Sequence, residues 1–271
     1  MKPAHAGLQP RTRRGSGLFL LAAAIGLGVG AISFAPARAL GLLVRELSGD
    51  QVRLLNARGT VWQGRAEWVL TGGSGSRSSA ALPQGMGWTL APTWSGGPAL
   101  QLKLSAPCCT PQGLDLLLAW RGGSARLELG RQQSLWPASW LAGLGSPWNT
   151  IQLQGSLQLQ AEGSGIEWAQ GRARLTGPLE LQALDLGSSL STLKPLGSYR
   201  IRLEPDAGGS PQLRLDTLRG ELKLSGEGRW TGGRLRFRGE AEAAAGSERA
   251  LSNLLNILGR RDGARAHISL G

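Results

Sequence analysis

An uncharged, largely apolar stretch, Gly17–Ala35, places the strongest constraint on how this chain can fold. As a helix it would be roughly 28 Å long, close to the thickness of the hydrocarbon core of a bilayer. The basic residues before it, which have no acidic residue among them, are Lys2, Arg11, Arg13 and Arg14. Because positive charge stays on the cytoplasmic side of a membrane, we expect a cytoplasmic tail at 1–16, a single transmembrane helix at 17–35 and an exported domain at 36–271.

Two other interpretations of this stretch stay open. A cleavable signal peptide has a shorter apolar region and ends in a small-x-small site, which residues 35–37 and 37–39 fit loosely. A helix buried in a soluble core normally carries a polar face, and this stretch has none. With either an anchor or a cleaved signal, the bulk of the chain is exported.

The composition of the chain favours an all-β fold. Glycine is frequent, at 42 residues, and short apolar alternations recur between glycine-rich turns. Such a pattern is typical of many short antiparallel strands. The formal net charge of +12 comes mostly from arginines, which are scattered along the expected strands and do not cluster. The solvated outer face of a sheet therefore explains them better than a nucleic-acid interface does.

The clearest strand pattern is Ile151–Gln160, where apolar and polar residues alternate. We expect the glutamines to face water and one side to be buried, namely Ile151, Leu153, Leu157 and Leu159. Short helices are predicted after Pro36, after Pro137 and after Ser247. The first has an apolar face of Leu40, Leu43, Val44 and Leu47, and the last has a stripe of Leu251, Leu254, Leu255 and Leu258.

Two further segments bear on the architecture. A weak internal repeat, Leu153–Gly177 and Leu218–Gly239, predicts two hairpins that each have one apolar face. Residues 71–81, rich in glycine and serine, are expected to form a flexible loop. Side-by-side hairpins must curl to cover their apolar side. The predicted fold is all-β with a few short helices: a curled, mostly antiparallel meander sheet forming a half-barrel or groove, with an amphipathic C-terminal helix.

The sequence offers little that could perform chemistry. His267 is the one histidine of the exported part, and it lies on the polar side of a predicted terminal strand. No nucleophile elbow, P-loop or dinucleotide-binding motif occurs, and no set of residues has the spacing of zinc ligands. We therefore predict no catalytic, cofactor-binding or metal-binding residues, and no enzyme activity.

The only two cysteines, Cys108 and Cys109, are adjacent in the sequence APCCTP. Export to an oxidising compartment permits a vicinal disulfide, which would constrain a turn and add little loop-closure stability. Two free thiols or pairing with another chain remain alternatives.

Several motifs resemble the family of type II secretion system protein N, GspN. The segment Ala57–Gly64 is similar to the family's Gly-Thr-hydrophobic-Trp-x-Gly signature, through Gly59, Thr60, Val61, Trp62 and Gly64. The segment Leu193–Tyr199 is similar to a Pro-Leu-Gly-x-Tyr element, through Pro195, Leu196, Gly197 and Tyr199. The N-terminal apolar stretch and the tail Leu251–Gly263 complete the resemblance.

This resemblance implies a non-catalytic, single-pass subunit of the bacterial inner membrane with a cytoplasmic N-terminus and a periplasmic β-rich domain. The implied role is support of the export of folded proteins from the periplasm across the outer membrane. The implied partners are other inner-membrane subunits of the secretion system and the outer-membrane secretin. The curled apolar sheet also resembles AsmA-like proteins, which makes a lipid-handling groove at the inner membrane the alternative function.

Two roles are open for Trp62 of the signature motif. Glycines on both sides would let the backbone bend while the indole covers the sheet, or the indole could stack on a ligand. We expect the sheet surface around Trp62 and Trp68 either to lock the fold or to bind partners.

Overall fold

The computed structural model describes residues 16–231 and 234–271, and the chain divides into two units, Met1–Ala35 and Pro36–Gly271. The described part of the first unit is mainly one helix, α1 (Ser16–Ser33). No helix in the described ranges is long and apolar enough to cross a membrane, so the span predicted at 17–35 is not supported here. The predicted cytoplasmic tail, 1–16, lies outside the described residues apart from Ser16.

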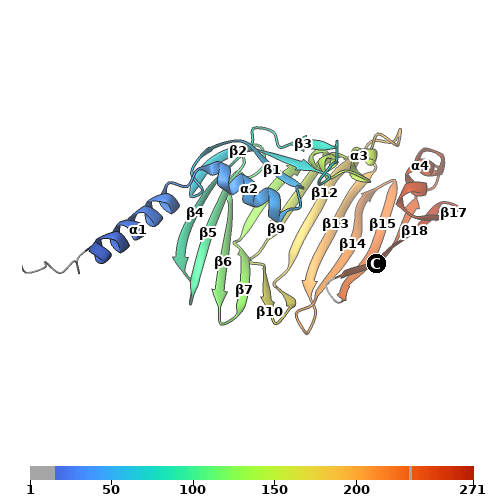
Figure 1. Cartoon of the computed structure of the whole chain (residues 1–271). Coiled ribbons are helices and arrows are strands. Elements are labelled where there is room, and N and C mark those ends of the chain that lie inside the picture. Colours follow the sequence, from blue (N-terminus) through green and yellow to red (C-terminus); the bar gives the residue numbers. More distant parts are fainter. Residues whose placement is uncertain (1–15, 232–233) are drawn as a thin grey trace, which may run out of the picture. The chain divides into compact units, whose positions relative to one another are not determined.

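The second unit contains two nine-stranded sheets, so the prediction of one continuous meander sheet is wrong (Figure 1). The first sheet has the order β1-β2-β4-β5-β6-β7-β10-β11, with β3 paired to β2. Its strands are β1 (Val52–Gly59), β2 (Gln63–Thr71), β3 (Ser79–Ala81), β4 (Met86–Trp94), β5 (Pro98–Ser105), β6 (Leu114–Arg121), β7 (Ser124–Leu129), β10 (Gly165–Ala169) and β11 (Arg172–Thr176).

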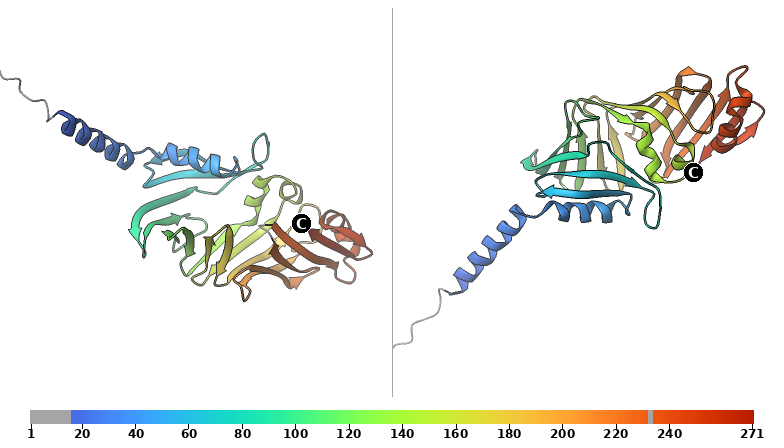
Figure 2. Two further views of the ribbon diagram at one scale, coloured as in Figure 1. Left: turned by 60° about the horizontal axis from the view of Figure 1, so that its bottom comes forward. Right: turned by 90° about the horizontal axis from the view of Figure 1, so that it is seen from above.

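The second sheet has the order β17-β18-β16-β15-β14-β13-β12-β9-β8. Its strands are β8 (Gln132–Pro137), β9 (Gln154–Ala161), β12 (Leu179–Gly187), β13 (Gly197–Pro205), β14 (Pro211–Gly220), β15 (Leu222–Thr231), β16 (Arg234–Ala243), β17 (Arg260–Asp262) and β18 (Arg265–Leu270). All described pairings in both sheets are antiparallel, which confirms the predicted all-β class, and both sheets are curved (Figure 2).

The chain changes sheets three times, and this breaks the predicted repeat. It leaves the first sheet after β7, forms β8 and β9 in the second, returns for β10 and β11, and then goes back for β12. The first repeat copy is therefore divided, because β9 pairs with β8 and β12 while β10 pairs with β7 and β11. The second copy is a plain hairpin of β15 and β16. The two copies share the same alternation of apolar and polar residues. This alternation gives each strand one apolar face, but it does not determine which strand lies beside it.

The strand predicted at 151–160 begins later than expected. Residues Trp148–Ile151 form a short helix, α3, and Gln152 ends it in the left-handed conformation, so β9 starts at Gln154. Ile151 is nevertheless buried in the core, and Leu153 packs against that core from the connecting segment. The apolar side of this segment faces inward as predicted.

The predicted helices are present, with two differences in detail. The helix after Pro36 is α2 (Ala37–Leu47), the helix after Pro137 is a 3₁₀ helix, η1 (Ala138–Leu144), and the C-terminal helix is α4 (Glu248–Leu258). Leu251, Leu254 and Leu255 of α4 are buried against strands of the second sheet. Ser247 does not cap α4 with its side chain, because its hydroxyl donates to Glu221 of the neighbouring chain segment instead.

The apolar face of α2 is turned from the predicted one. Leu40 and Val44 pack on the first sheet beside the buried Ala37, whereas Leu43 and Leu47 are exposed. A Cβ atom placed on Gly41 would lie 3.5 Å from the Leu54 carbonyl oxygen. Small residues at 37 and 41 therefore allow the close approach, and they set which side of the helix faces the sheet.

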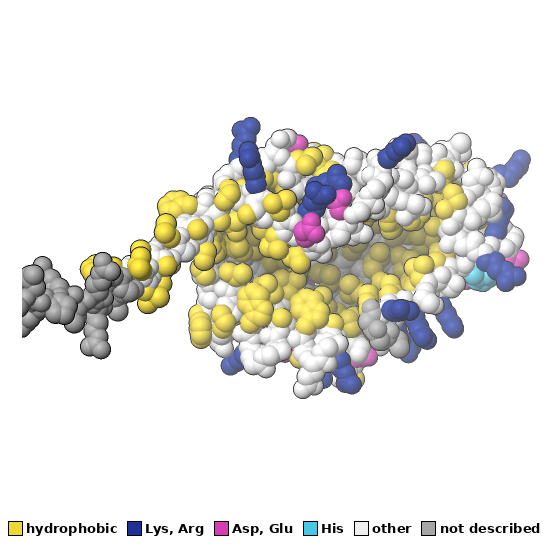
Figure 3. Space-filling view, in the orientation of Figure 1, with side chains coloured by type: hydrophobic (Ala, Val, Ile, Leu, Met, Phe, Trp, Pro, Cys, Tyr) yellow, Lys and Arg dark blue, Asp and Glu magenta, His cyan; other side chains and the backbone are white. Residues whose placement is uncertain are grey.

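One face of each sheet is apolar. In the first sheet Leu118 lies opposite Leu100 and Leu127, and Leu127 lies opposite Ile166. In the second sheet Ile201 lies opposite Leu181 and Leu215. These side chains are only half-buried, and Figure 3 shows hydrophobic side chains gathered in a hollow of this unit.

The glycine- and serine-rich segment 71–81 is partly ordered by its neighbours. Ser79–Ala81 pairs with β2, and the Trp140 indole of η1 donates to the Ala80 carbonyl. The side-chain amide of Asn149 donates to the Ser78 hydroxyl at 2.9 Å. Only the part between the two strands is an irregular loop, so the prediction holds for about half of the segment.

Candidate functional site

The signature segment Gly59–Gly64 forms the turn between β1 and β2. Gly59 has a φ of +95°, and a Cβ atom there would lie 2.4 Å from the Gln63 carbonyl oxygen, so the turn requires glycine. Thr60 closes the turn, since its backbone N–H donates to the Gln63 carbonyl at 2.8 Å and its hydroxyl accepts from the Gln63 N–H at 3.1 Å. The motif thus specifies a tight connection between the two strands.

The same turn holds the buried indole of Trp88 on β4. The Trp88 Nε1 donates to the carbonyl of Val61 at 3.0 Å, and the side chain is 3% exposed. A Cβ atom on Gly64 would lie 2.5 Å from the Trp88 ring, so glycine at 64 makes room for it. Trp62 itself is half-buried and belongs to none of the buried clusters, while its carbonyl accepts from the Leu90 N–H at 2.6 Å. The core tryptophan of this region is therefore Trp88.

The second motif, Pro195–Tyr199, joins three strands of the second sheet. The Leu196 N–H donates to the Leu186 carbonyl at 2.6 Å, and the Leu196 carbonyl accepts from the Leu222 N–H at 3.1 Å. The peptide bond between Lys194 and Pro195 is cis. This segment therefore links β12 to β15 across the start of β13.

Tyr199 completes that junction. Its hydroxyl donates to the Leu222 carbonyl at 2.9 Å, and its ring packs with Ala138, Ala183 and Leu186. Burial raises the pKa of the phenol well above its ordinary value, because the phenolate cannot be solvated there. A Cβ atom on Gly197 would lie 2.7 Å from the Tyr199 hydroxyl oxygen, so glycine at 197 is needed for the ring to fit.

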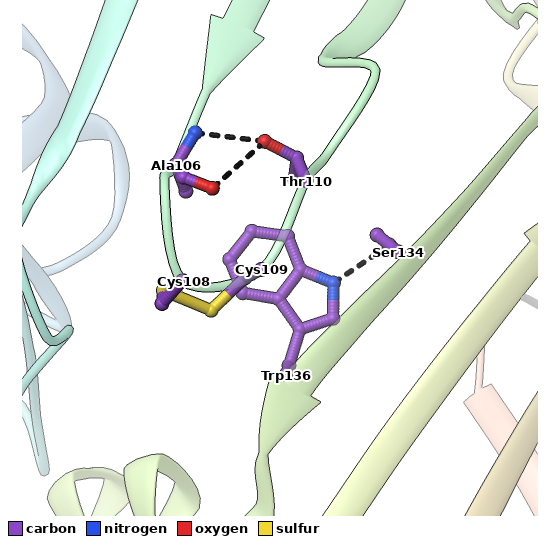
Figure 4. The surroundings of a disulfide bond; sticks show 6 residues. All are labelled: Ala106, Cys108, Cys109, Thr110, Ser134 and Trp136. Atoms are coloured by element: carbon purple, nitrogen blue, oxygen red, sulfur yellow. Dashed lines mark hydrogen bonds between the residues drawn. A yellow bond between two sulfur atoms is a disulfide. The ribbon is translucent and has the colours of Figure 1, made fainter.

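Cys108 and Cys109 form a disulfide in the turn that follows β5 (Figure 4). The Thr110 hydroxyl accepts from the Ala106 N–H at 2.7 Å and closes the turn. Cys109 is 1% exposed, and its carbonyl accepts from the Leu135 N–H of β8 at 2.8 Å. The disulfide turn therefore connects the first sheet to an edge strand of the second.

Aromatic side chains pack beside this turn. Trp136 and Trp140 stack with their ring centroids 5.6 Å apart, and the Trp136 Nε1 donates to the Ser134 hydroxyl. Both indoles pack against the cluster that contains Cys109. Cys109 is therefore part of a packed junction, whereas Cys108 is exposed at the surface of the turn.

Metal-ligating side chains are not gathered into one cluster in the described part of the chain. Among the described residues, no group of three or more His, Cys, Asp and Glu side chains could hold a metal ion. His267 is exposed on β18 opposite Glu240 of β16, in a shallow surface depression. The two motifs do not form one site either, since the first adjoins Trp88 of one buried cluster and the second contributes Leu196 and Tyr199 to two others.

The family model described as type II secretion system (T2SS), protein N matches residues 50–268. The chain belongs to the type II secretion system protein N family. This confirms the resemblance drawn from the motifs, and it makes the chain a component of type II secretion that acts together with other components of that system. Neither the curated proteins nor the solved structures gave a match.

Both motifs lie within the range that matches the family model. This range includes both sheets and the motif turn, and it starts within the α2–β1 connection. In both motifs a glycine packs tightly against a buried aromatic ring. Gly64 packs against Trp88, and Gly197 packs against Tyr199. The residues of the two family motifs are therefore ones that hold the strands of this chain together.

The residue that the sequence analysis missed in this region is Trp88. A signal for it existed, because Trp88 and Leu90 share one side of a strand and β2 offers a glycine at Gly64. The pairing of Gly64 with Trp88 across β2 and β4 decides the contact, and a single sequence does not reveal that register.

Proposed function

We propose that this chain is a non-catalytic subunit of the type II secretion machinery that supports export of folded proteins from the periplasm across the outer membrane. The observation that carries the proposal is the family match over residues 50–268. In this proposal residues 17–35 anchor the chain in the bacterial inner membrane, the N-terminus is cytoplasmic and residues 36–271 are periplasmic. The partners are other inner-membrane subunits of the system and the outer-membrane secretin.

The sequence and the disulfide support the proposed location. The stretch Gly17–Ala35 is uncharged and follows a basic tail, which is the charge pattern of a segment that keeps its N-terminus in the cytoplasm. The disulfide of Cys108 and Cys109 fits an oxidising compartment such as the periplasm.

The surface chemistry supports action by contact with other proteins. The outer face of the second sheet carries arginine–carboxylate pairs, such as Glu180 with Arg200 and Arg202, and Glu227 with Arg214. The pair of Glu227 and Arg214 is exposed, and the pairs of Glu180 are half-buried. Exposed pairs stabilise a fold little, but charged groups of this kind suit a polar contact surface.

The proposal is tested by a secretion assay in the native bacterium. Deletion of the gene should leave the secreted enzymes of the type II pathway in the periplasm, and the wild-type chain should restore their appearance in the medium. Secretion that is unchanged by the deletion would contradict the proposed role.

The anchor is tested separately. Replacing residues 1–35 with a cleavable signal peptide should release 36–271 into the soluble periplasmic fraction, whereas the intact chain should remain with inner-membrane vesicles after a carbonate wash. Recovery of the intact chain in the soluble fraction would overturn the anchoring.

A second function is favoured by one observation, the half-buried apolar faces of the sheets. Leu100, Leu102, Leu116 and Leu118 point to the apolar face of the first sheet without being fully covered. An exposed apolar groove is a binding surface for apolar ligands, so an AsmA-like lipid-handling role is the alternative.

Neighbouring residues on β6 separate the two functions. Leu118 points to the apolar face and Leu117 to the other, since they alternate along the strand. A photoreactive amino acid placed at 118 in intact cells should crosslink to lipid if the groove handles lipid, and the same group at 117 should not. Protein crosslinks at 117 together with no lipid crosslinks at 118 would support the proposed role as a subunit of the secretion machinery.

A further inference from the structure

Three exposed tryptophans stand at the turns of three neighbouring hairpins in the first sheet. Trp94, Trp120 and Trp168 are 76%, 41% and 42% exposed. Each one ends or nearly ends its strand, and the hairpin turn follows within a few residues. Large apolar side chains exposed together mark an interaction surface more often than single ones do.

The strand register places the three indoles on the same face. Trp120 lies opposite Ala125 of β7, and Ala125 lies opposite Trp168 of β10. Trp94 lies opposite Pro98 of β5. Ala99 pairs with Ala119, so Pro98 and Trp120, which adjoin that pair on the same side, occupy matching positions of β5 and β6. Directly opposed residues of antiparallel strands share a face. The three residues therefore form one row, which we name the tryptophan rim.

The rim lies at the edge of the apolar face. The row one step further into the sheet is Pro92, Leu100, Leu118, Leu127 and Ile166. The hairpin ends of β6, β7 and β10 lie along one edge of the unit in Figure 1. A depression between these tips is lined by Pro98, Trp120, Ala125 and Trp168. The indoles thus border the apolar hollow on one side and solvent on the other.

The tips around the rim carry positive charge and no negative charge. Arg121 and Arg172 are exposed there, and the segments 94–98, 120–125 and 168–173 contain no Asp or Glu. A Cβ atom on Gly96 would lie 3.3 Å from the Arg121 guanidinium, so that side chain extends over the turn that follows Trp94. Within the described residues, neither guanidinium forms an ion pair.

We propose that the tryptophan rim docks the hairpin tips of β4–β5, β6–β7 and β10–β11 onto an anionic lipid surface. Indoles favour the interface between headgroups and acyl chains because their rings are apolar and their N–H groups are polar. Each basic residue close to an anionic membrane adds attraction that salt screens. Exposed indoles together with unpaired arginines match that surface better than they match an apolar protein groove.

Tryptophan fluorescence in the full chain tests this docking. All ten tryptophans follow residue 61, so the N-terminal helix contributes nothing to the signal. The chain would be reconstituted into phosphatidylcholine vesicles, with or without phosphatidylglycerol, whose acyl chains carry bromine. Bromolipid should quench wild-type emission, more strongly with phosphatidylglycerol present and less at high salt.

Two variants and a matched control complete the test. The triple variant Trp94→Ser, Trp120→Ser, Trp168→Ser should lose most of the quenching, and Arg121→Gln with Arg172→Gln should remove its dependence on phosphatidylglycerol. Trp148→Ser removes a similarly exposed indole from α3, outside the three hairpins, and should keep the quenching. Circular dichroism would verify that each variant is folded.

Three results would overturn the docking. These are wild-type emission that bromolipid does not quench, quenching that the triple variant retains, and quenching that is equal with and without phosphatidylglycerol. The last result would mean that lipid enters the hollow regardless of its headgroup. If the first result is found and the triple variant also loses secretion, the rim contacts a protein instead of lipid.

Discussion

At the scale of single residues, the fold depends on aromatic rings seated against glycines. Trp88 packs on Gly64 and Tyr199 packs on Gly197, and in each case the ring's polar atom donates to a backbone carbonyl. A buried aromatic ring contributes a large apolar area, and its polar atom requires a partner when it is buried. Each of these positions therefore depends on the shape of the ring and on one hydrogen bond from it.

We predict that Trp88→Ala destabilises the protein by about 3–5 kcal/mol, because it removes a large buried ring and leaves a cavity. Trp62→Ala should cost clearly less, because Trp62 is half-buried and outside the buried clusters. Chemical denaturation monitored by circular dichroism measures both. Gly64→Ala is a third variant, and it should cost about 1–3 kcal/mol since the added methyl group would overlap the Trp88 ring. An equal loss for Trp62→Ala and Trp88→Ala would show that the motif tryptophan is the core residue after all.

We predict that Tyr199→Phe destabilises the protein by about 1–3 kcal/mol at neutral pH, because the buried Leu222 carbonyl loses its donor. The raised pKa of Tyr199 adds a pH dependence. The unfolded phenol ionises near pH 10 while the folded one stays protonated, so the wild type loses stability as the pH rises above about 10. The variant has no phenol at 199, so the difference in stability between the wild type and Tyr199→Phe should become smaller in this alkaline range. Denaturation curves from pH 8 to 11 measure this, and a constant difference would contradict it.

At the scale of elements, an arginine–aspartate cluster fixes helix α2 to the sheet. Asp50 is 6% exposed, and its carboxylate accepts from Arg53 at 2.8 and 2.6 Å and from Arg45 of α2 at 2.9 Å. Its backbone carbonyl accepts from the Thr71 hydroxyl at the end of β2. One carboxylate therefore joins a helix to the strand that follows it.

We predict that this cluster makes α2 sensitive to acid. The hydrogen bond from Arg53 and the charge of Arg45 lower the pKa of Asp50. A lowered carboxyl pKa stabilises the fold above the ordinary value of about 3.9, and that stabilisation is lost as the pH falls through the folded pKa. Asp50→Asn should therefore remove part of the stability loss seen between pH 5 and 2 in the wild type. Asparagine also tolerates the positive φ of this residue.

The control for this prediction is Asp115→Asn, which removes an exposed carboxylate 3.7 Å from Lys103. Thermal melts across the same pH range should match those of the wild type. An acid response that is the same in the wild type and in Asp50→Asn would show that Asp50 does not hold the helix.

At the scale of the whole β unit, the architecture depends on where the two sheets join. The disulfide turn bonds to β8, and η1 packs beside β3 with its indole on Ala80. Leu175 of β11 donates to the Gly209 carbonyl in the turn between β13 and β14. The sheets are therefore linked at several places by loops and edge strands, and no strand is shared between them.

We predict that the two cysteines are unequal. Both single variants, Cys108→Ser and Cys109→Ser, remove the disulfide, but only Cys109 is buried in the apolar cluster. Under reducing conditions Cys109→Ser should be less stable than Cys108→Ser by about 1–3 kcal/mol, because it buries a hydroxyl among apolar groups. Reduction of the wild type should have a small effect, since the closed ring is very short. Equal stability of the two variants would mean that the turn is not a packed junction.

Much of this protein followed from the sequence. Period-two alternation predicted the antiparallel strands, and period-3.6 spacing predicted α2 and α4, because a half-buried strand or helix must repeat its apolar residues at its own geometric period. The motif residues around Gly59 and Pro195 predicted the family. Adjacent cysteines raised the possibility of the disulfide that the structure contains.

Only the tertiary structure decided which strands are neighbours. The divided repeat, the two sheets in place of one, the seating of Trp88 on Gly64 and the alignment of Trp94, Trp120 and Trp168 all depend on register between strands distant in sequence. Alternation assigns each residue to a face but gives no information on partner or register, since any apolar face can cover any other. The local periods are therefore a property of the sequence alone, whereas the rows of side chains that could bind something arise from the assembled sheets.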